Sequence, residues 1–329
     1  MRDVLPELMR WWEAGETVGV AIINLETIAN KKIVIMGGTG FLGKFLIKQL
    51  LDSKANVILL SRNTSMLSDF YEATISGQLT IINGDVLDKS FLQNSINKVD
   101  SIINLCGILY ENKSGDFDRV HSDLPAMLGE ISTEKKIKSL IHVSALGVFE
   151  KSKSSYSRSK ASGERRLLEN FPKGIIMRPS LLFGKGDNFF GQFSEMASIS
   201  PFLPLISGKT KFQPVFVNDV AKSILNVLFK KNNKSSIYAL GGNYSYTFEN
   251  LLKILLKIKG IKRFFIPLNP NLMMLPALFL ERLPKPPFTV DQMKLLKHDN
   301  ILNGDLPGLK ELGIEPSDME EELIKIYSK

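Results

Sequence analysis

The sequence predicts an α/β fold in which a doubly wound parallel sheet carries a smaller C-terminal lobe. Short apolar runs of strand length alternate with helical stretches along most of the chain, which is the pattern of a parallel sheet. The first run leads through a glycine-rich turn into an amphipathic helix. With 329 residues, 44% of them hydrophobic, the chain is long enough to bury a sizeable core.

The glycine-rich turn predicts a dinucleotide-binding site of the Rossmann type. A strand over 31–36 precedes the turn and a helix over 44–51 follows it. Gly37 permits the tight turn, Gly40 lets the backbone approach a pyrophosphate, and Gly43 lets the helix pack against the strand. The N–H groups at the helix start face the anion. The alternative is a helix-start turn without a ligand. The other turn residues that we assign to the cofactor are Thr39, Phe41 and Leu42.

Further apolar runs complete the predicted sheet and divide the chain into parts. Strands are expected over 56–60, 79–85, 101–105, 139–144 and 175–178, with a late strand of the same sheet over 237–240. We therefore predict an N-terminal extension over 1–30, a Rossmann domain over 31–242 and a C-terminal lobe over 243–329. Part of the small lobe is inserted in the Rossmann domain at about 185–215.

Composition and charge narrow the classes of function. The formal net charge is +8, but no dense Lys/Arg run is interleaved with aromatic residues, so we expect no nucleic acid partner. The single cysteine, Cys106, excludes an internal disulfide and a cysteine zinc cluster, and we predict no metal site. Charged residues interrupt 1–30, so we expect no secretory signal there. We predict a reducing, cytoplasmic location, with peripheral contact at the inner face of the membrane as a further option.

Tyr156 and Lys160 are the candidate catalytic residues. Their spacing of four places both side chains on one face of a helix. An ammonium beside a phenol favours the phenolate and lowers the pKa of the tyrosine, which makes Tyr156 a usable proton donor near neutral pH. Lys160 is also expected to reach the ribose of a nicotinamide cofactor. The alternative is a solvated helix face.

With this pair, residues from 31 to about 320 resemble the extended short-chain dehydrogenase/reductases of the NAD-dependent epimerase/dehydratase family. The resemblance implies a nicotinamide dinucleotide as cofactor. It also assigns further cofactor contacts, which are Asp85 and Val86 beside the adenine, Leu105 and Gly107 along the ribose, and Pro179 in the loop on the nicotinamide side.

Within that family the chain is similar to an atypical subgroup around the nucleotide-binding accessory subunit of respiratory complex I. The segments that carry this likeness are 104–111, 142–147, 208–214 and 291–300. The likeness implies a cofactor-holding accessory or assembly protein for a respiratory membrane complex or for quinone biosynthesis. The alternative is an active NADP(H)-dependent reductase or epimerase for an apolar or quinone-like carbonyl substrate. A redox-sensing regulator is a third hypothesis, for which the sequence holds no dedicated feature.

Two positions depart from an active dehydrogenase of this family. The Ser or Thr that holds the substrate oxygen aligns with Ala145, and the neighbouring Ser144 points to the opposite face of the strand. The asparagine of the family's catalytic tetrad falls near His121, which we interpret as a structural histidine rather than a proton relay. The cofactor half of the site is therefore complete, whereas the substrate half is depleted.

The end of the second predicted strand favours NADP(H). NAD-selective sites place an acidic residue there to bind the ribose diol. Ser61 carries no charge that would repel a 2′-phosphate, and Arg62 can pair with one. We therefore favour NADP(H) over NAD(H). The alternative is that Arg62 stacks on the adenine.

Residues 264–280 form the most apolar stretch of the chain and contain no charge. The stretch is shorter than the ~20 residues of a membrane-spanning helix, and three prolines break it. We favour lobe core or the lining of an apolar substrate site. The alternative is a surface that dips into the membrane interface beside Lys262 and Arg263.

Overall fold

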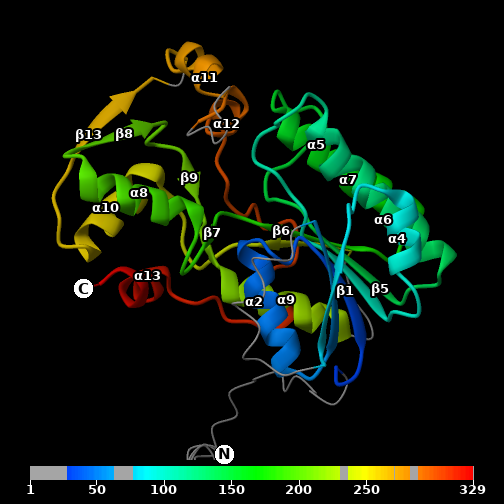
Figure 1. Ribbon diagram of the computed structural model, residues 1–329. Helices are drawn as coiled ribbons and strands as arrows, with labels where there is room; N and C mark the ends of the chain where they lie inside the picture. The colour runs from blue at the N-terminus through cyan, green and yellow to red at the C-terminus, as the bar shows by residue number, and fades with distance from the viewer. Residues whose placement is uncertain (1–27, 63–76, 230–235, 270, 282–287, 329) are drawn as a thin grey trace, which may run out of the picture.

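A seven-stranded parallel sheet in the order β11-β6-β5-β4-β1-β2-β3 forms the centre of the protein (Figure 1). The computed structural model describes residues 28–62, 77–229, 236–269, 271–281 and 288–328. Residues 1–27, which make up most of the predicted N-terminal extension, lie outside the described part. Every strand pairs with its neighbours in parallel, so the predicted doubly wound fold is confirmed.

The strands of this sheet lie where the sequence places them. They are β1 (Lys32–Met36), β2 (Asn56–Ser61), β3 (Leu79–Asn83), β4 (Ser101–Asn104), β5 (Ser139–Val143), β6 (Ile175–Pro179) and β11 (Ile237–Leu240). All four residues of β4 are buried, as expected for a central parallel strand with helices on both faces. The third strand is shorter than predicted, because it ends at Asn83 and leaves Asp85 in the turn that follows.

Two helical layers cover the sheet (Figure 1). α2 (Phe41–Asp52) and α9 (Val217–Phe229) pack against each other on one face. α4 (Lys89–Ser95), α6 (Leu124–Glu134) and α7 (Ser155–Asn170) share the apolar cluster of the other face. Side chains cap two of these helices: Asp88 accepts from the backbone at the start of α4, and Ser154 does so at the start of α7.

A π-helical turn joins the short helix before α6 to α6 itself. α5 (Asp116–Asp118) runs into this turn, η2 (Arg119–Asp123), which continues as α6. α7 lies so close to the turn that a Cβ atom at Gly163 would be 1.8 Å from the carbonyl oxygen of His121. The absence of a side chain at Gly163 therefore sets how near α7 can come to His121.

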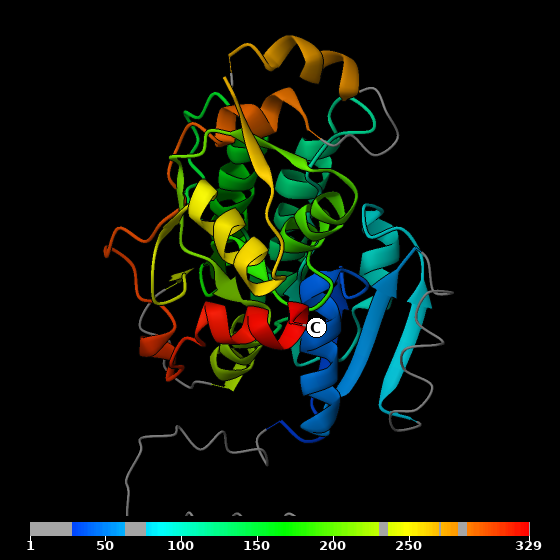
Figure 2. The same cartoon turned by 90° about the vertical axis from the view of Figure 1, so that its left-hand side faces the viewer.

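The smaller lobe stands above one end of the sheet (Figures 1 and 2). Its apolar cluster joins α8 (Asn188–Ile199), α10 (Phe248–Ile258) and α13 (Met319–Tyr327). Three two-stranded pairs complete it, which are β8 (Phe202–Ile206) with β13 (Phe264–Leu268), β9 (Lys211–Phe212) with β12 (Tyr246–Thr247), and β7 (Leu182–Phe183) with β10 (Val215–Phe216). The lobe therefore draws on two separate parts of the chain.

The segment after the lobe helices returns to the sheet. Near the η3 turn (Lys310–Leu312), Leu309 and Ile314 pack into the same apolar cluster as α2 and α9. The N–H of Ala239 in β11 donates to the carbonyl of Pro307 at 2.9 Å. The C-terminal part of the chain thus contacts both the lobe and the core beneath the sheet.

The apolar stretch over 264–280 lies largely at the surface. It forms β13, at the edge of the lobe, and α11 (Met274–Leu280), which packs against α12 (Val290–Leu295). Phe264 is 72% exposed, Leu272 75% and Leu278 47%. The favoured interpretation of this stretch as lobe core is therefore wrong for these side chains. Ala277 is buried and packs in one cluster with Met293 of α12.

We predict that Gly163→Ala destabilises the protein by about 1–3 kcal/mol or more, because the new methyl group overpacks the contact with the His121 carbonyl. Gly191→Ala is the matched control. Gly191 also lies within a helix, but a Cβ atom there would meet only the Tyr327 hydroxyl at 4.0 Å. This control should leave stability unchanged or raise it by about 0.5–1 kcal/mol. Equal free energies of unfolding for both variants in urea would contradict the prediction.

Candidate functional site

The glycine turn connects β1 to α2 and depends on glycine at two positions. Gly37 has a φ of +75°, and a Cβ atom there would lie 2.7 Å from the carbonyl carbon of Leu105. A Cβ atom at Gly43 would lie 2.4 Å from the Cα of Gly38. Any other residue would force the segment after β4 away from the turn, or α2 away from β1.

The first turn of α2 has the properties of an anion-binding site. Gly40 precedes the helix in an extended conformation, no side chain caps the helix, and its first turn contains no acidic residue. A Cβ atom at Gly40 would meet only the carbonyl oxygen of Gly37, at 3.2 Å. A larger side chain would therefore fill the space in front of the helix N–H groups, which is the space that a pyrophosphate takes.

The other predicted residues of the turn are placed differently from one another. Thr39 lies within the turn and is partly exposed. Phe41 packs against the apolar cluster of α2 and α9, and Leu42 is buried inside it. The contribution of Leu42 to a cofactor would therefore come from its backbone N–H.

The segment after β4 borders the glycine turn at the point where the strand order reverses. Open α/β sheets bind their ligands at such a point, beyond the carboxyl ends of the strands. The N–H of Leu105 donates to the carbonyl of Met36 at 3.0 Å. A Cβ atom at Gly107 would lie 3.3 Å from the Nζ of Lys160. The structure thus brings Leu105, Gly107 and Lys160 to one edge of the sheet.

Three further predicted cofactor residues lie at the carboxyl ends of β2 and β3. Ser61 ends β2 and Arg62 follows it at the surface, while Asp85 follows β3. Burial raises the pKa of the Cys106 thiol to about 12. The positive charges of Lys160 and Arg62 oppose this rise and the carboxylate of Asp85 adds to it.

The last two predicted cofactor residues are Val86 and Pro179. Val86 packs against the apolar cluster of α4, α6 and α7. Pro179 ends β6, two strands away from β4 in the sheet. Its carbonyl accepts from the N–H of Leu146 at 2.9 Å, so Pro179 borders the loop that follows β5.

Lys160 is a buried cation beneath the segment after β4. It is 3% exposed, and its ammonium donates to the carbonyl of Val143 at 3.2 Å. Burial lowers the pKa of Lys160 to about 8, although the carboxylate of Glu164 opposes this fall. Glu164 in turn accepts from Arg178, whose Nε lies 3.0 Å from Oε1. Lys160, Glu164 and Arg178 therefore form a row of alternating charges, and Lys160 is at its buried end.

Tyr156 lies in the first turn of α7, in an aromatic setting. Its ring meets the ring of His121 edge-on at 5.2 Å between centroids, and that of Phe117 at 5.9 Å. Burial raises the pKa of Tyr156 to about 12. The expectation that Lys160 lowers this pKa is therefore wrong in this structure, because desolvation decides its direction and the ammonium of Lys160 is hydrogen-bonded to a backbone carbonyl.

His121 has both ring nitrogens engaged. Nε2 accepts from the N–H of Ile108 at 3.0 Å. Nδ1 lies 3.1 Å from the Oγ of Ser159, whose hydroxyl donates to the carbonyl of Tyr156 at 2.9 Å. Nδ1 must therefore carry the proton, and the ring is neutral. Burial, with the nearby charge of Lys160, lowers the pKa of His121 to about 2. These contacts agree with a structural histidine.

Ser144 and Ala145, the two residues after β5, differ in burial. The Oγ of Ser144 is buried and has no hydrogen-bond partner within the described ranges. Ala145 is partly exposed. β5 ends at Val143, so both residues lie in the loop after the strand and the predicted strand alternation does not apply to them.

Sequence reasoning missed a buried pair at the ends of β4 and β5. The Oδ1 of Asn104 accepts from the N–H of Cys106 at 3.0 Å, which turns its amide nitrogen toward the Nδ1 of His142 at 3.1 Å. His142 therefore carries its proton on Nε2, which is buried without a partner in the part of the chain that the structure describes. Burial holds the pKa of His142 well below its usual value. Both residues begin segments that carry the family likeness.

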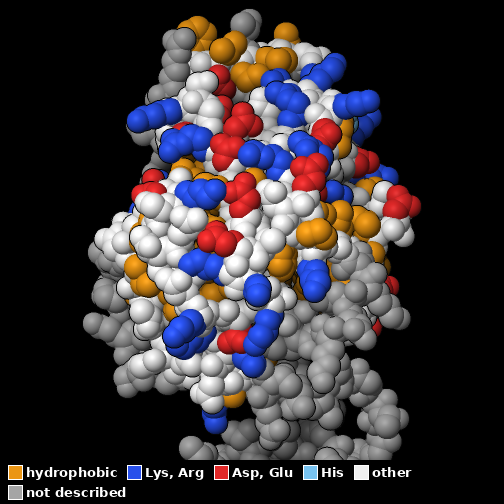
Figure 3. Space-filling view, turned by 90° about the vertical axis from the view of Figure 1, so that its right-hand side faces the viewer, with side chains coloured by type: hydrophobic (Ala, Val, Ile, Leu, Met, Phe, Trp, Pro, Cys, Tyr) orange, Lys and Arg blue, Asp and Glu red, His pale blue; other side chains and the backbone are white. Residues whose placement is uncertain are grey.

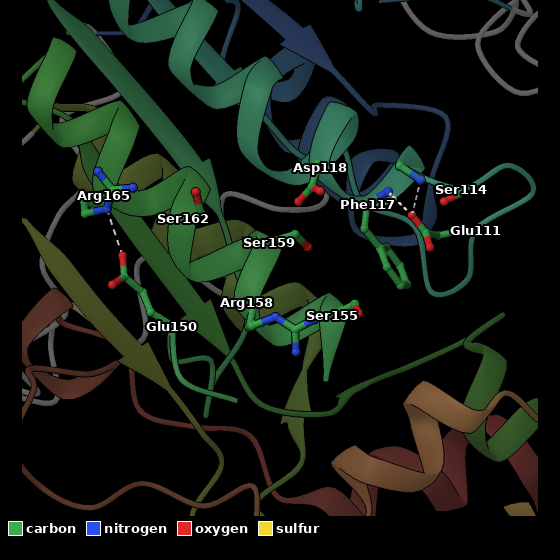
Figure 4. A pocket seen from close by; sticks show the side chains of 11 residues that line it. Glu111, Ser114, Phe117, Asp118, Glu150, Ser155, Arg158, Ser159, Ser162 and Arg165 are labelled. Atoms are coloured by element: carbon green, nitrogen blue, oxygen red, sulfur yellow. Dashed lines mark hydrogen bonds and ion pairs between the residues drawn. The ribbon is translucent and has the colours of Figure 1, made fainter. Parts of the chain in front are cut away.

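A polar cavity of about 490 Å³ lies on the outer side of α7 (Figure 4). Its walls come from one face of α7 and from the segment around α5, and they include Glu111, Asp118, Ser159 and Arg165. The glycine turn contributes nothing to this cavity. It is therefore separate from the predicted dinucleotide site, although Ser159 also contacts His121.

The face formed by α4, α6 and α7 shows mixed charge (Figure 3). Lys and Arg side chains alternate with Asp and Glu over the face formed by α4, α6 and α7, where Lys89 and Glu130 pair at 2.7 Å (Figure 3). Within the described ranges, no group of three or more His, Cys, Asp or Glu residues could hold a metal ion. None of the described helices has both the length and the apolar character needed to cross a bilayer.

The sheet and the glycine turn together define a dinucleotide-binding protein of the doubly wound class. The chain belongs to the NAD dependent epimerase/dehydratase family, whose model matches residues 33–241. The family agrees with the prediction of a nicotinamide dinucleotide as cofactor.

The known proteins that this chain resembles include the following two relatives and a solved structure with a similar fold. The chain is 32% identical to NADH dehydrogenase [ubiquinone] 1 alpha subcomplex subunit 9 of Mus musculus, over 90% of this chain and 79% of that protein. It is 25% identical to the ceramide reductase of Caulobacter vibrioides, over 61% and 62% of the two chains. The UDP-glucose 4-epimerase of Thermotoga maritima matches the fold with a TM-score of 0.68 and 18% identity, over 90% of this chain and 97% of that one.

The two buried histidines predict an acid-sensitive fold. Both are neutral in the folded protein, whereas an unfolded histidine titrates near about pH 6.5. The unfolded state therefore binds more protons below that pH, and the free energy of unfolding falls as the pH drops, by up to about 1.4 kcal/mol per pH unit for each histidine. His121→Gln should remove one such contribution between about pH 6 and pH 5.

Urea unfolding at a series of pH values measures this slope. His298→Gln is the control, because His298 lies exposed at the surface. The slope of this control should equal that of the unmodified protein. A slope that His121→Gln leaves unchanged would contradict the neutral, buried state of that histidine.

Proposed function

We propose that the chain holds a nicotinamide dinucleotide in the glycine turn and acts, with little turnover, as an accessory or assembly protein of a respiratory NADH:ubiquinone oxidoreductase complex. The observation that carries the proposal is the contrast between the two halves of the site. The glycine turn fits a pyrophosphate, whereas Ala145 offers no hydroxyl and His121 has no free ring nitrogen. The similarity to subunits of such complexes supports the choice of partner over quinone biosynthesis.

The residues around the turn account for retention of the cofactor. Gly37 lets the segment after β4 lie close to the turn, Gly40 leaves room for the pyrophosphate, and Lys160 would reach the ribose. When bound, a reduced nicotinamide supplies a hydride. Transfer of that hydride to a carbonyl needs a proton for the new alkoxide, and a Tyr156 hydroxyl with its pKa raised to about 12 is a poor donor near neutral pH.

Two substitutions distinguish a protein that only holds its dinucleotide from an enzyme that uses it in catalysis. Gly40→Val should abolish dinucleotide binding and, with it, the assembly or activity of the respiratory complex, because the side chain fills the pyrophosphate space. Tyr156→Phe should leave both intact. Calorimetry with NADPH and NADH, together with the content of mature complex in cells, provides the measurements. Normal dinucleotide binding by a folded Gly40→Val variant would show that the glycine turn is not the binding site. A loss of complex assembly or activity in Tyr156→Phe would favour a role that requires turnover.

The alternative is an NADP(H)-dependent reductase that acts on an apolar carbonyl substrate. Tyr156 and Lys160 on α7 support it, as does the more distant similarity to a protein named ceramide reductase. In that case Tyr156 would give the proton to the substrate oxygen, and a bound reduced nicotinamide would supply the hydride. NADPH oxidation that requires both an added carbonyl substrate and Tyr156 would establish this alternative.

We further propose a preference for NADP(H), carried by Arg62 at the end of β2. Pairing with a 2′-phosphate is a charge-assisted contact that contributes about 1.5–3 kcal/mol. Arg62→Glu should therefore weaken NADPH binding at least tenfold and spare or improve NADH binding. Calorimetry with both dinucleotides measures the effect. Equal losses for the two would mean that Arg62 stacks on the adenine or supports the fold.

The exposed apolar residues of β13, of α11 and of the turn before α11 support peripheral membrane contact beside the exposed side chain of Lys262. Replacing Leu272 and Leu278 together by Ser should reduce flotation with anionic liposomes, and added salt should weaken flotation of the unmodified protein. Ile324→Ser is the control, since Ile324 is also exposed but lies on α13. No flotation of the unmodified protein would exclude this contact.

The predicted reducing, cytoplasmic location stays a prediction. The names of the similar NADH dehydrogenase subunits include the word mitochondrial, which applies to those proteins and does not locate this chain.

A further inference from the structure

A carboxylate from the C-terminal lobe holds the start of the helix that bears Tyr156. Asp291, in α12, accepts three hydrogen bonds there. Its Oδ1 accepts from the N–H of Ser155 at 2.8 Å, and its Oδ2 accepts from the N–H of Tyr156 at 3.0 Å and from the hydroxyl of Ser154 at 2.6 Å. A residue 135 positions along the chain thus fixes the backbone of the candidate catalytic tyrosine.

These bonds lie in a setting that makes them strong. The side chain of Asp291 is 15% exposed, and the positive end of the α7 dipole faces its negative charge. Lys294 is the one charged group paired with it in the described structure, at 3.7 Å. Ser154 completes the arrangement, because its hydroxyl donates to Asp291 while its oxygen accepts from the N–H of Ser157. The first turn of α7 is therefore capped from two elements at once.

The same segment of the lobe, residues 289–300, ties down two neighbouring loops. The amide of Asn300 donates to the carbonyl of Leu146, after β5, at 2.8 Å, and its Oδ1 accepts from the hydroxyl of Ser180, after β6, at 2.6 Å. The ring of His298 meets that of Phe149 edge-on. One segment of the lobe thus contacts the start of α7 and the loops after β5 and β6, which lie on the nicotinamide side of the proposed site.

The other side of α12 faces the exposed apolar surface. Met293 packs against Ala277 of α11, the helix that exposes Leu278. The N–H of Val290, at the start of α12, donates to the carboxylate of Glu281 just after α11. α12 therefore stands between the surface proposed for membrane contact and the tyrosine helix.

We propose that Asp291 is a positioning residue, which sets the place of Tyr156 and Lys160 and so couples the seating of the C-terminal lobe to how the site holds its dinucleotide. This inference rests on the proposed cofactor-holding function. It assigns a role to the segment 291–300, which carries the family likeness and which the cofactor site does not use.

Asp291→Ala tests the coupling, with Asp88→Ala as the matched control. Asp88 caps α4 through the same kind of bonds, to the N–H groups of Ser90 and Phe91, away from the C-terminal lobe. We expect Asp291→Ala to speed hydrogen exchange of the Ser155 and Tyr156 amides and to weaken NADPH binding, each about tenfold or more, as loss of a charge-assisted bond predicts. The fluorescence emission of bound NADPH should shift. Asp88→Ala should change neither amide exchange in α7 nor that emission.

Asp291→Asn provides a second variant if Asp291→Ala does not fold. It keeps one acceptor for Ser155 but places an amide N–H against two donors, so its effects should match those of Asp291→Ala in direction. Faster amide exchange with unchanged affinity and emission would reduce Asp291 to a structural cap and overturn the proposal. Unchanged exchange would also overturn it. Failure of the unmodified protein to bind NADPH or NADH would refute the cofactor-holding function, while the exchange data still decide whether Asp291 orders α7.

Discussion

The burial of one ammonium group, that of Lys160, governs the chemistry of the whole site. Its charge lies inside the protein against the carbonyl of Val143, close to two histidines and a thiol. Because a neighbouring cation and desolvation act in the same direction on an imidazole, both histidines are neutral. Neutral rings can then serve as fixed acceptors for backbone and amide N–H groups. The end of the sheet is thereby ordered around Lys160, the residue that we propose to reach the ribose of a cofactor.

The two halves of the proposed site differ in what they offer a ligand. The glycine turn and the segment after β4 keep the close backbone approach that a dinucleotide requires. On the other side, Tyr156 is packed among aromatic rings, His121 is fully engaged and Ala145 lacks a hydroxyl. A protein that holds its cofactor for structural purposes needs only the first half. Rapid turnover would need the second.

The C-terminal lobe contributes more than a cover over the strand ends. Its 289–300 segment forms hydrogen bonds to the start of α7 and to the loops after β5 and β6. The same lobe exposes apolar side chains on β13 and α11. A partner or a membrane that touches this surface is thus connected to the tyrosine helix through the packing of Met293 on Ala277 and through the carboxylate of Asp291.

The sequence by itself determined the parallel sheet, the glycine turn and the pairing of Tyr156 with Lys160 on one helix, because period, glycine spacing and i,i+4 geometry are local properties. Only the tertiary structure decided the direction of the Tyr156 pKa, since desolvation depends on what packs around the ring. It also decided that residues 264–280 lie at the surface, which an apolar run cannot reveal. The cap that Asp291 places on α7 joins residues far apart in the chain, so no local pattern could have predicted it.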